Sequence, residues 1–125
     1  MEKQKILIAD DSEMNRALLV DILEEQYDVA EAENGVEAIS LLSRHRTDYS
    51  LLLLDIMMPE MDGFEVLAYI NKYHWNDTFA VIMISADDSP ANIKRAYDLG
   101  AFDYISRPFD STIVQRRISN TMFLY

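Results

Sequence analysis

Residues 49–55 read Tyr-Ser-Leu-Leu-Leu-Leu-Asp, an apolar run on consecutive positions that ends in an acid. A second run of this kind, Phe-Ala-Val-Ile-Met-Ile-Ser, occupies residues 79–85. A strand with one face in water alternates apolar and polar residues, whereas a strand covered on both faces is apolar throughout. Both runs therefore predict central strands of a parallel sheet that has helices packed on each side.

Outward from these runs, strand-like and helix-like segments alternate along the chain. Short β-branched or aliphatic segments predict strands, and apolar residues three to four positions apart predict helices. Five such units of about 25 residues favour an α/β fold, a flavodoxin-like parallel sheet in the order 2-1-3-4-5, over an eight-unit barrel. The expected strands cover Lys5–Asp10, Asp28–Ala32, Tyr49–Asp55, Phe79–Ser85 and Ala101–Ser106, and the expected helices cover Glu13–Gln26, Val36–Arg44, Gly63–Tyr73, Ala91–Leu99 and Asp110–Met122.

Composition limits the classes of function. The chain has 125 residues, half of them apolar, so we expect one domain over 1–125. Cysteine is absent, which excludes disulfides, and no apolar run approaches the roughly 20 residues that cross a bilayer. Because the first residues lead straight into a strand-like segment, we expect no signal peptide and a cytoplasmic location. The net charge of -11 argues against direct binding to nucleic acid.

The expected topology brings polar residues together at one edge of the sheet. Open α/β sheets bind ligands at the carboxyl ends of their strands, near the point where the strand order reverses. The first strand ends in Asp10-Asp11, the third ends in Asp55, and Ser85 and Arg107 stand at the ends of the fourth and fifth. Converging carboxylates repel one another unless a cation lies between them. Oxygen ligands suit a hard ion, so the sequence predicts a site for Mg²⁺ (or Mn²⁺).

This set of groups favours phosphoryl transfer to Asp55. A carboxylate assisted by a metal ion is a competent nucleophile toward phosphorus. A hydroxyl, Ser85, and a cation, Arg107, would then hold the phosphoryl oxygens. These residues also have ordinary structural interpretations. Asp11 or Ser12 could cap the first helix, and Asp55 taken alone could be a structural residue at the end of a strand. Their common place at one edge is what favours a functional site.

Four motifs resemble the receiver domain of bacterial response regulators, the phosphoacceptor domain of two-component signalling. They are ILIADD at 6–11, LLLLDIMMPEMDG at 51–63, VIMISA at 81–86 and GAFDYISRPF at 100–109. The resemblance implies a signalling domain that is not an enzyme beyond its own phosphorylation and dephosphorylation. It also implies a sensor histidine kinase or a phosphotransfer protein as the partner that supplies the phosphoryl group.

The resemblance gives the acids their individual roles. Asp55 matches the phosphoacceptor. Asp10 and Asp11 match the acidic pair that holds Mg²⁺, with Asp11 as the more direct ligand. Met57 matches the position whose backbone carbonyl completes the metal shell, while Pro59 and other loop residues match the segment after the phosphoacceptor.

The resemblance also implies a switch and a control of access. Ser85 matches the switch hydroxyl that moves toward the phosphoryl group, and Tyr104 matches the aromatic side chain that changes rotamer with it. Ala86 matches the small residue that leaves the site open. Met57 and Asp87 match positions that tune hydrolysis, and an apolar Met57 predicts slow self-dephosphorylation.

One residue departs from the family pattern. The family has a lysine before the proline that follows the last strand, and here that residue is Arg107. The positive charge is kept, but a guanidinium is a planar fork whereas an ammonium is a point charge. The resemblance therefore does not decide whether phosphorylation of this chain is coupled to a change of shape. The resemblance also predicts a cis peptide bond between Arg107 and Pro108.

The resemblance places the output surface on the fourth helix, fifth strand and fifth helix, where we expect a homodimer contact or an output partner. The chain is either a stand-alone regulator or a piece of a longer one whose output domain is missing. Two alternatives remain. A phosphatase of the haloacid dehalogenase class would need a second Asp two residues after its nucleophile on the first strand, where this chain has Ser12. A receiver-like interaction module would have lost phospho-switching through Arg107.

Overall fold

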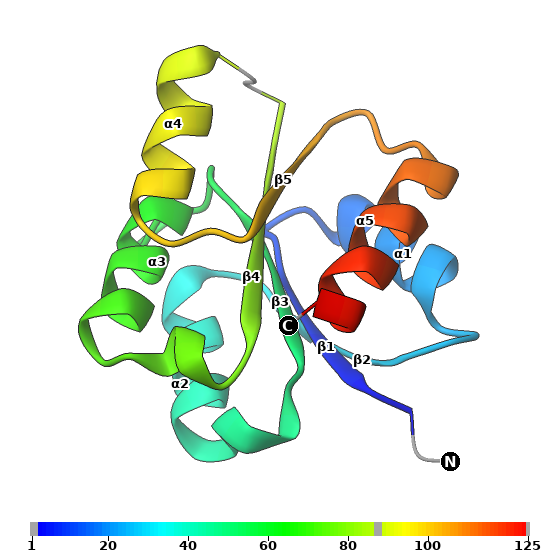
Figure 1. Ribbon diagram of the computed structural model, residues 1–125, viewed down its shortest axis with the longest axis horizontal. Helices are drawn as coiled ribbons and strands as arrows, with labels where there is room; N and C mark the ends of the chain where they lie inside the picture. The colour runs from blue at the N-terminus through cyan, green and yellow to red at the C-terminus, as the bar shows by residue number, and fades with distance from the viewer. Residues whose placement is uncertain (1–2, 87–88, 125) are drawn as a thin grey trace.

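The computed structural model describes residues 3–86 and 89–124, which form one parallel sheet between two layers of helices (Figure 1). The sheet has the order β2-β1-β3-β4-β5, and each neighbouring pair is parallel. The predicted fold class and strand order are thus confirmed. The elements in chain order are β1 Lys5–Ala9, α1 Glu13–Leu23, β2 Asp28–Ala32, α2 Gly35–His45, η1 Arg46–Asp48, β3 Leu51–Asp55, α3 Gly63–Lys72, η2 Trp75–Asp77, β4 Ala80–Ser85, α4 Pro90–Asp98, β5 Asp103–Ser106 and α5 Ser111–Leu124.

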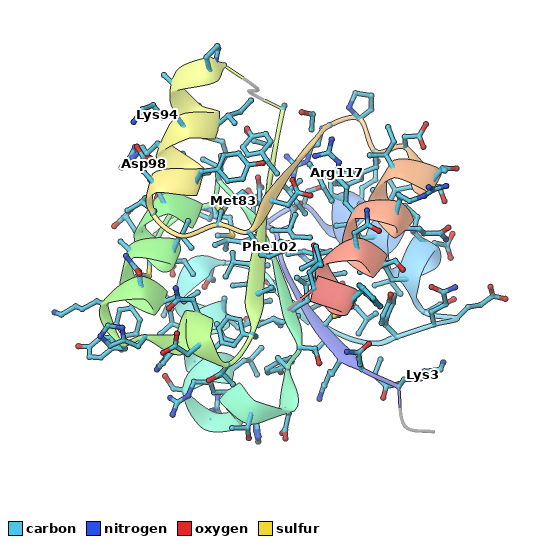
Figure 2. All side chains as sticks on the ribbon, viewed as in Figure 1. Lys3, Met83, Lys94, Asp98, Phe102 and Arg117 are labelled. Carbon is cyan, nitrogen blue, oxygen red and sulfur yellow. The ribbon has the colours of Figure 1, made fainter. Side chains whose placement is uncertain are left out.

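The two apolar runs lie at the centre of the sheet and feed two separate cores. Leu52 and Leu54 face α2, α3 and α4, whereas Leu51 and Leu53 face α1 and α5 on the other side. Successive side chains of a strand point to opposite faces, so a strand covered on both faces needs apolar residues at every position. Side chains fill the space on both sides of the sheet (Figure 2), which explains the unbroken runs of the sequence.

The bounds of several elements differ from the predicted ones because backbone pairing and caps decide where an element ends. The first helix ends at Leu23 rather than Gln26, since the N–H groups of Gln26 and Tyr27 both donate to the carbonyl of Leu23 and close a turn. The last strand is shorter than predicted and begins at Asp103. Two short 3₁₀ segments, η1 and η2, were not predicted. None of the described helices is both long and apolar enough to cross a membrane.

Candidate functional site

The candidate site lies at the edge of the sheet where β1, β3, β4 and β5 end, the upper edge in Figure 1. Asp10 directly follows β1, and its N–H donates to the carbonyl of Ala32 at 3.1 Å, which extends the sheet by one residue. Asp55 is the last residue of β3 and lies in register with Ile84 of β4. Both carboxylates are almost fully buried, with exposed fractions of 0% and 1%.

Three carboxylates come together at this edge. Oxygen atoms of Asp10, Asp11 and Asp55 lie within 4.8 Å of one another, and Asp11 is the exposed member of the group. Ser12, not Asp11, caps α1, because the Ser12 hydroxyl accepts the N–H of Asn15. The side chain of Asp11 therefore stays available at the rim of the site.

Burial and charge repulsion make the Asp55 carboxyl group harder to ionise. Burial in the first place, and the neighbouring Asp10 charge in the second, raise the pKa of Asp55 from its ordinary value of 3.8 to about 6. The charge of Arg107 and a hydrogen bond from the Met57 N–H to Oδ1 at 3.3 Å act in the opposite direction. A cation that met these acids would relieve the repulsion and favour the ionised carboxylate.

Arg107 joins the two buried acids. Its Nη2 contacts Oδ2 of Asp10 and lies 3.1 Å from Oδ2 of Asp55. The second pair is close but not aligned as a hydrogen bond, so Oδ2 of Asp55 and Nε of Arg107 have no hydrogen-bond partner among the described residues. The Arg107 N–H donates to the carbonyl of Ser85 at 3.0 Å, which places the arginine beside the end of β4.

These residues fit a divalent hard cation. Two of the three clustered carboxylates pair with Arg107, and one buried carboxylate oxygen lacks a hydrogen-bond partner in the described chain. Mg²⁺ prefers oxygen ligands and is usually held by one or two carboxylates, with water and phosphate oxygens completing its shell. The cluster therefore has the donor set that the sequence predicts for a metal.

The other predicted site residues surround this cluster. Ser85 is buried at the end of β4, and Tyr104 is buried on β5 in register with Met83. Met57 is 71% exposed, and Ala86 is exposed as well. Asp87 lies outside the described residues. The roles of these residues in switching and access remain predictions.

The peptide bond between Arg107 and Pro108 is cis, which confirms that prediction. This bond lies in the segment between β5 and α5, and its first residue is Arg107, which contacts Asp10 and Asp55.

One residue that contacts the site, Arg16, was not predicted from the sequence. Arg16 lies on α1 with only 9% exposure, and its Nη1 donates to the carbonyl of Asp10 at 2.7 Å. Its Nε donates to the carboxylate of Glu31 at 3.1 Å. A signal was present, because Arg16 shares the spacing of the buried Leu19 and Leu23 and so stands at an apolar position of its helix.

Gly63 is required where α3 begins beside the end of β3. A Cβ at this position would lie 2.3 Å from the carbonyl oxygen of Asp55 and 2.7 Å from Cα of Ile56. Both are backbone atoms that cannot turn away, so only glycine allows α3 to pack this close to the end of β3.

Gly63→Ala is expected to lower the free energy of unfolding by about 1–3 kcal/mol, because the new methyl group displaces the backbone at Asp55. Urea denaturation of the variant and the wild type measures this difference in the free energy of unfolding. Gly100→Ala is the control, since its nearest atom is 3.6 Å away and its cost arises from a φ of 102° instead. Only the Gly63 variant should also weaken Mn²⁺ binding. Equal Mn²⁺ affinity in both variants would contradict the argument.

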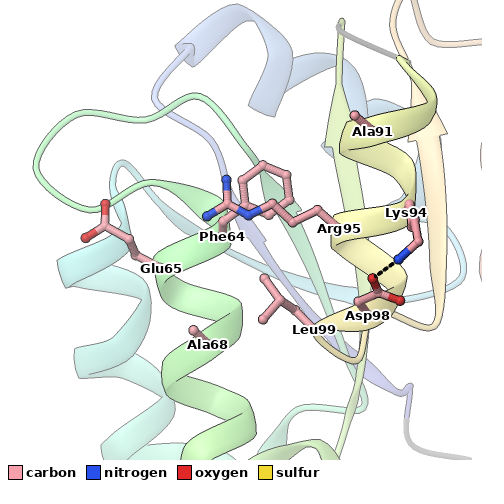
Figure 3. Close-up of a pocket in the computed structure, with 8 residues that line it drawn as sticks. All are labelled: Phe64, Glu65, Ala68, Ala91, Lys94, Arg95, Asp98 and Leu99. Carbon is pink, nitrogen blue, oxygen red and sulfur yellow. Dashed lines mark hydrogen bonds and ion pairs between the residues drawn. The ribbon is translucent and has the colours of Figure 1, made fainter.

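A groove lies outside the acidic cluster, between α3 and α4, and has a volume of about 520 Å³. In this groove the Arg95 guanidinium lies over the Phe64 ring, 4.2 Å from its centre (Figure 3). Lys94 and Asp98 pair across one turn of α4 at its rim. The lining residues include none of the acidic cluster, so this groove is separate from the candidate site.

Comparisons with known proteins agree with this geometry. The family model described as response regulator receiver domain matches residues 6–119. The chemotaxis protein CheY of Halobacterium salinarum is 40% identical over 124 residues, which cover 98% of both chains. A probable cyclic di-GMP phosphodiesterase of Vibrio cholerae is 34% identical over 113 residues, 90% of this chain but 25% of its own length. In the crystal structure of the CheX-CheY-BeF3-Mg²⁺ complex from Borrelia burgdorferi, the matched chain has a TM-score of 0.89 and 30% identity, with 95% of this chain and 89% of that one covered.

The fold and the site together define a class, a parallel α/β domain with clustered acids and the Arg107 guanidinium at the carboxyl edge of its sheet. The chain belongs to the response regulator receiver domain family of two-component systems. The resemblance read from its motifs is thereby confirmed.

Proposed function

We propose that this domain accepts a phosphoryl group on Asp55 from a sensor histidine kinase or a phosphotransfer protein, in a reaction that depends on Mg²⁺ or Mn²⁺. The observation that carries the proposal is the buried Asp55 carboxylate, gathered with Asp10 and Asp11 within 4.8 Å. Such a cluster is costly without a cation, and its position at the switch point of the sheet is where this fold binds ligands.

The residues present can perform the transfer. Oδ1 of Asp55 accepts the Met57 N–H, whereas Oδ2 lies beside Arg107 without a hydrogen-bond partner in the described chain and would be the atom that attacks phosphorus. As the O–P bond forms, the N–P bond of a phosphohistidine donor breaks and its electron pair returns to the imidazole. Arg107, 3.1 Å from Oδ2, would follow the negative charge from the carboxylate to the phosphoryl oxygens.

A metal ion would be held by the carboxylates of Asp10, Asp11 and Asp55 and by the backbone carbonyl of Met57. When bound, it would neutralise the acids and draw charge from a phosphoryl oxygen. The domain would promote only its own phosphorylation and dephosphorylation, without turnover of other phosphate esters.

The mass of the intact protein after incubation with acetyl phosphate tests this proposal. We expect the wild type to gain one phosphoryl group with Mg²⁺ present and none with a chelator, and Asp55→Asn to gain none in either case. Uptake by Asp55→Asn equal to that of the wild type would overturn the assignment of the acceptor.

We propose that the phosphoryl group draws Ser85 and Arg107 inward, and that Tyr104 then fills the space beside Ser85. The support is that Ser85 and Tyr104 are both buried on neighbouring strands, so a shift of one requires the other to repack. α4, β5 and α5 would change shape together.

Arg107 also supports an alternative, a receiver-like interaction module in which phosphorylation no longer drives the switch. Beryllofluoride with Mg²⁺ separates the two, because it mimics an acyl phosphate. Changes in the backbone NMR signals of Ser85 and Tyr104 in the wild type would support switching. No change in the wild type, with a response restored by Arg107→Lys, would favour the interaction module.

The phosphoryl donor is proposed to dock beside Arg107, which contacts Asp55. A cavity of about 350 Å³ lies there, lined by Leu18, Arg107, Phe109 and their neighbours. Met14 and Leu18 extend this surface from α1, with exposed fractions of 73% and 48%. An apolar rim around a buried acceptor suits a protein donor that excludes water during the transfer.

Asp103 connects the three elements of the proposed output surface. The carboxylate of Asp103 on β5 accepts the Tyr97 hydroxyl of α4 at 3.2 Å and pairs with Arg117 of α5 at 3.4 Å. We propose that this face forms a homodimer or meets an output partner, in a cytoplasmic protein. The chain spans only a quarter of the phosphodiesterase it matches, so an output domain outside these residues is part of the proposal.

Arg116→Glu tests the output surface, because Arg116 is exposed on α5 and the change reverses its charge. We expect weaker self-association of the phosphorylated protein, measured by sedimentation. A charge reversal on the opposite layer, at exposed Arg44 of α2, is the control and should have no effect. Unchanged association in both variants would count against this surface.

Met57 is proposed to slow hydrolysis of the acyl phosphate, because its exposed apolar side chain lies two residues from Asp55 and would shield the phosphoryl group from water. Met57→Asn should shorten the lifetime of the phosphorylated protein, followed by intact mass over time. An unchanged lifetime would remove the support for shielding.

A further inference from the structure

A buried arginine lies beneath the loop that carries two of the three acids. Arg16 stands one turn into α1, on the face that also buries Leu19 and Leu23. Its guanidinium is shared between two acceptors on different elements. Nη1 donates to the backbone carbonyl of Asp10 at 2.7 Å, and Nε donates to the Glu31 carboxylate on β2 at 3.1 Å. A long charged side chain is rarely this buried unless its donors have such partners.

The carbonyl of Asp10 belongs to the peptide group that joins Asp10 to Asp11. The other polar groups of Asp10 are already fixed, since its N–H donates to Ala32 and its Oδ1 accepts the N–H of Ser12 at 2.9 Å. The side chain of Asp11 is exposed and makes no hydrogen bond or ion pair with the described residues. Its direction therefore depends on how the preceding peptide group is turned, and the partner of that peptide's oxygen is Arg16.

We propose that Arg16 is a positioning residue for the metal, which it affects by orienting the Asp10–Asp11 peptide so that the Asp11 carboxylate faces Asp55. The inference rests on the proposed metal site and extends it to a residue that cannot touch the ion itself. The planar fork of arginine suits this role, because it holds the carbonyl and the Glu31 carboxylate at fixed directions at the same time. An ammonium group at this position holds one acceptor well and leaves the other with water.

The rival explanation is that Arg16 merely fastens α1 to β2 through Glu31. The two explanations differ in what they predict for metal binding. Loss of the Glu31 ion pair alone leaves the Asp10 carbonyl with its donor, so a positioning role predicts little change in metal affinity. The half-exposed position of Glu31, with 47% of its side chain accessible, also makes this ion pair a weak fastener.

The test measures the dissociation constant for Mn²⁺ by electron paramagnetic resonance of the free ion. Arg16→Met is expected to weaken binding by about 10–100-fold, the usual effect of removing a group that orients a metal ligand. Arg16→Lys keeps the charge but loses the fork, and should weaken binding by a smaller factor. Glu31→Gln should stay within about 3-fold of the wild type, because it keeps the contact to Asp10.

Leu19→Ala is the control for stability. It removes a fully buried side chain from the same face of α1 and leaves the polar contacts intact, so it lowers stability without moving the Mn²⁺ constant. If Arg16→Met does not fold, the Mn²⁺ affinity of Arg16→Lys decides between the two explanations. An affinity equal to that of the wild type would overturn the proposal. An equal loss of affinity in Leu19→Ala and the Arg16 variants would overturn it as well. A wild type that binds no Mn²⁺ would contradict the metal site, whereas binding that Arg16→Met leaves unchanged would contradict only the role of Arg16.

Discussion

Asp55→Asn is expected to abolish phosphoryl uptake and, in the absence of a divalent ion, to make the domain more stable than the wild type at neutral pH. The Asp55 carboxylate is buried next to Asp10, and its pKa is raised to about 6. The ionised carboxylate therefore lowers the stability of the fold, as expected of a buried group that is kept for a functional role. An amide of the same shape removes the repulsion and leaves Arg107 paired with Asp10.

The pH dependence of this effect follows from the direction of the shift. In the unfolded chain Asp55 ionises near 3.8, whereas in the fold it ionises near 6. The protonated acid thus favours the folded state fully below pH 3.8, and this contribution is lost as the pH rises through 6. Between these values the wild type should lose about 3 kcal/mol of stability that Asp55→Asn does not lose.

Urea unfolding of both proteins in chelator at several pH values between 4 and 7 measures this difference. Mg²⁺ at pH 7 should then stabilise the wild type more than the variant, because the ion pairs with the carboxylate that the variant lacks. Identical pH slopes, or a variant less stable than the wild type at pH 7, would show that Asp55 is not strained by its neighbours.

Asp11→Asn is the second substitution with a large expected effect, and it should act on metal binding without acting on the fold. Asp11 is exposed and Ser12 already caps α1, so the free energy of unfolding should change by less than about 0.5 kcal/mol. Removal of one carboxylate ligand should weaken Mn²⁺ binding by about 100-fold and slow phosphorylation accordingly.

The matched control for Asp11→Asn is Asp21→Asn, an equal change of charge at an exposed position of α1 that does not belong to the cluster. Calorimetric titration with Mn²⁺ should leave Asp21→Asn equal to the wild type. Equal affinity in all three proteins would mean that the ion binds elsewhere, while equal losses would mean that only overall charge matters.

The fold could be predicted from the sequence because the decisive signal is local. Leucine at four consecutive positions before Asp55 is explained only by burial on both faces, and the two cores on either side of β3 are what that pattern requires. The same topology brings Asp10 and Asp55 to one edge, so the convergence of the acids follows from the order of the strands.

The details that the sequence could not supply depend on side-chain reach and on competition between neighbours. Whether Asp11 or Ser12 caps α1 depends on the local turn, and Ser12 takes that place. Arg107 was expected near Asp55, but its contact with Asp10 depends on how a long side chain bends. Arg16 stands at an apolar position, and only the structure gives it the Asp10 carbonyl as partner.

The most direct test of the central claim locates the phosphoryl group itself. Borohydride reduces the acyl phosphate of an aspartate to homoserine, which peptide mass spectrometry assigns to one residue. After treatment with acetyl phosphate and Mg²⁺, homoserine is expected at residue 55 and nowhere else, and it should be absent when a chelator replaces Mg²⁺. Homoserine at another residue, or the same yield with and without the metal ion, would contradict the account.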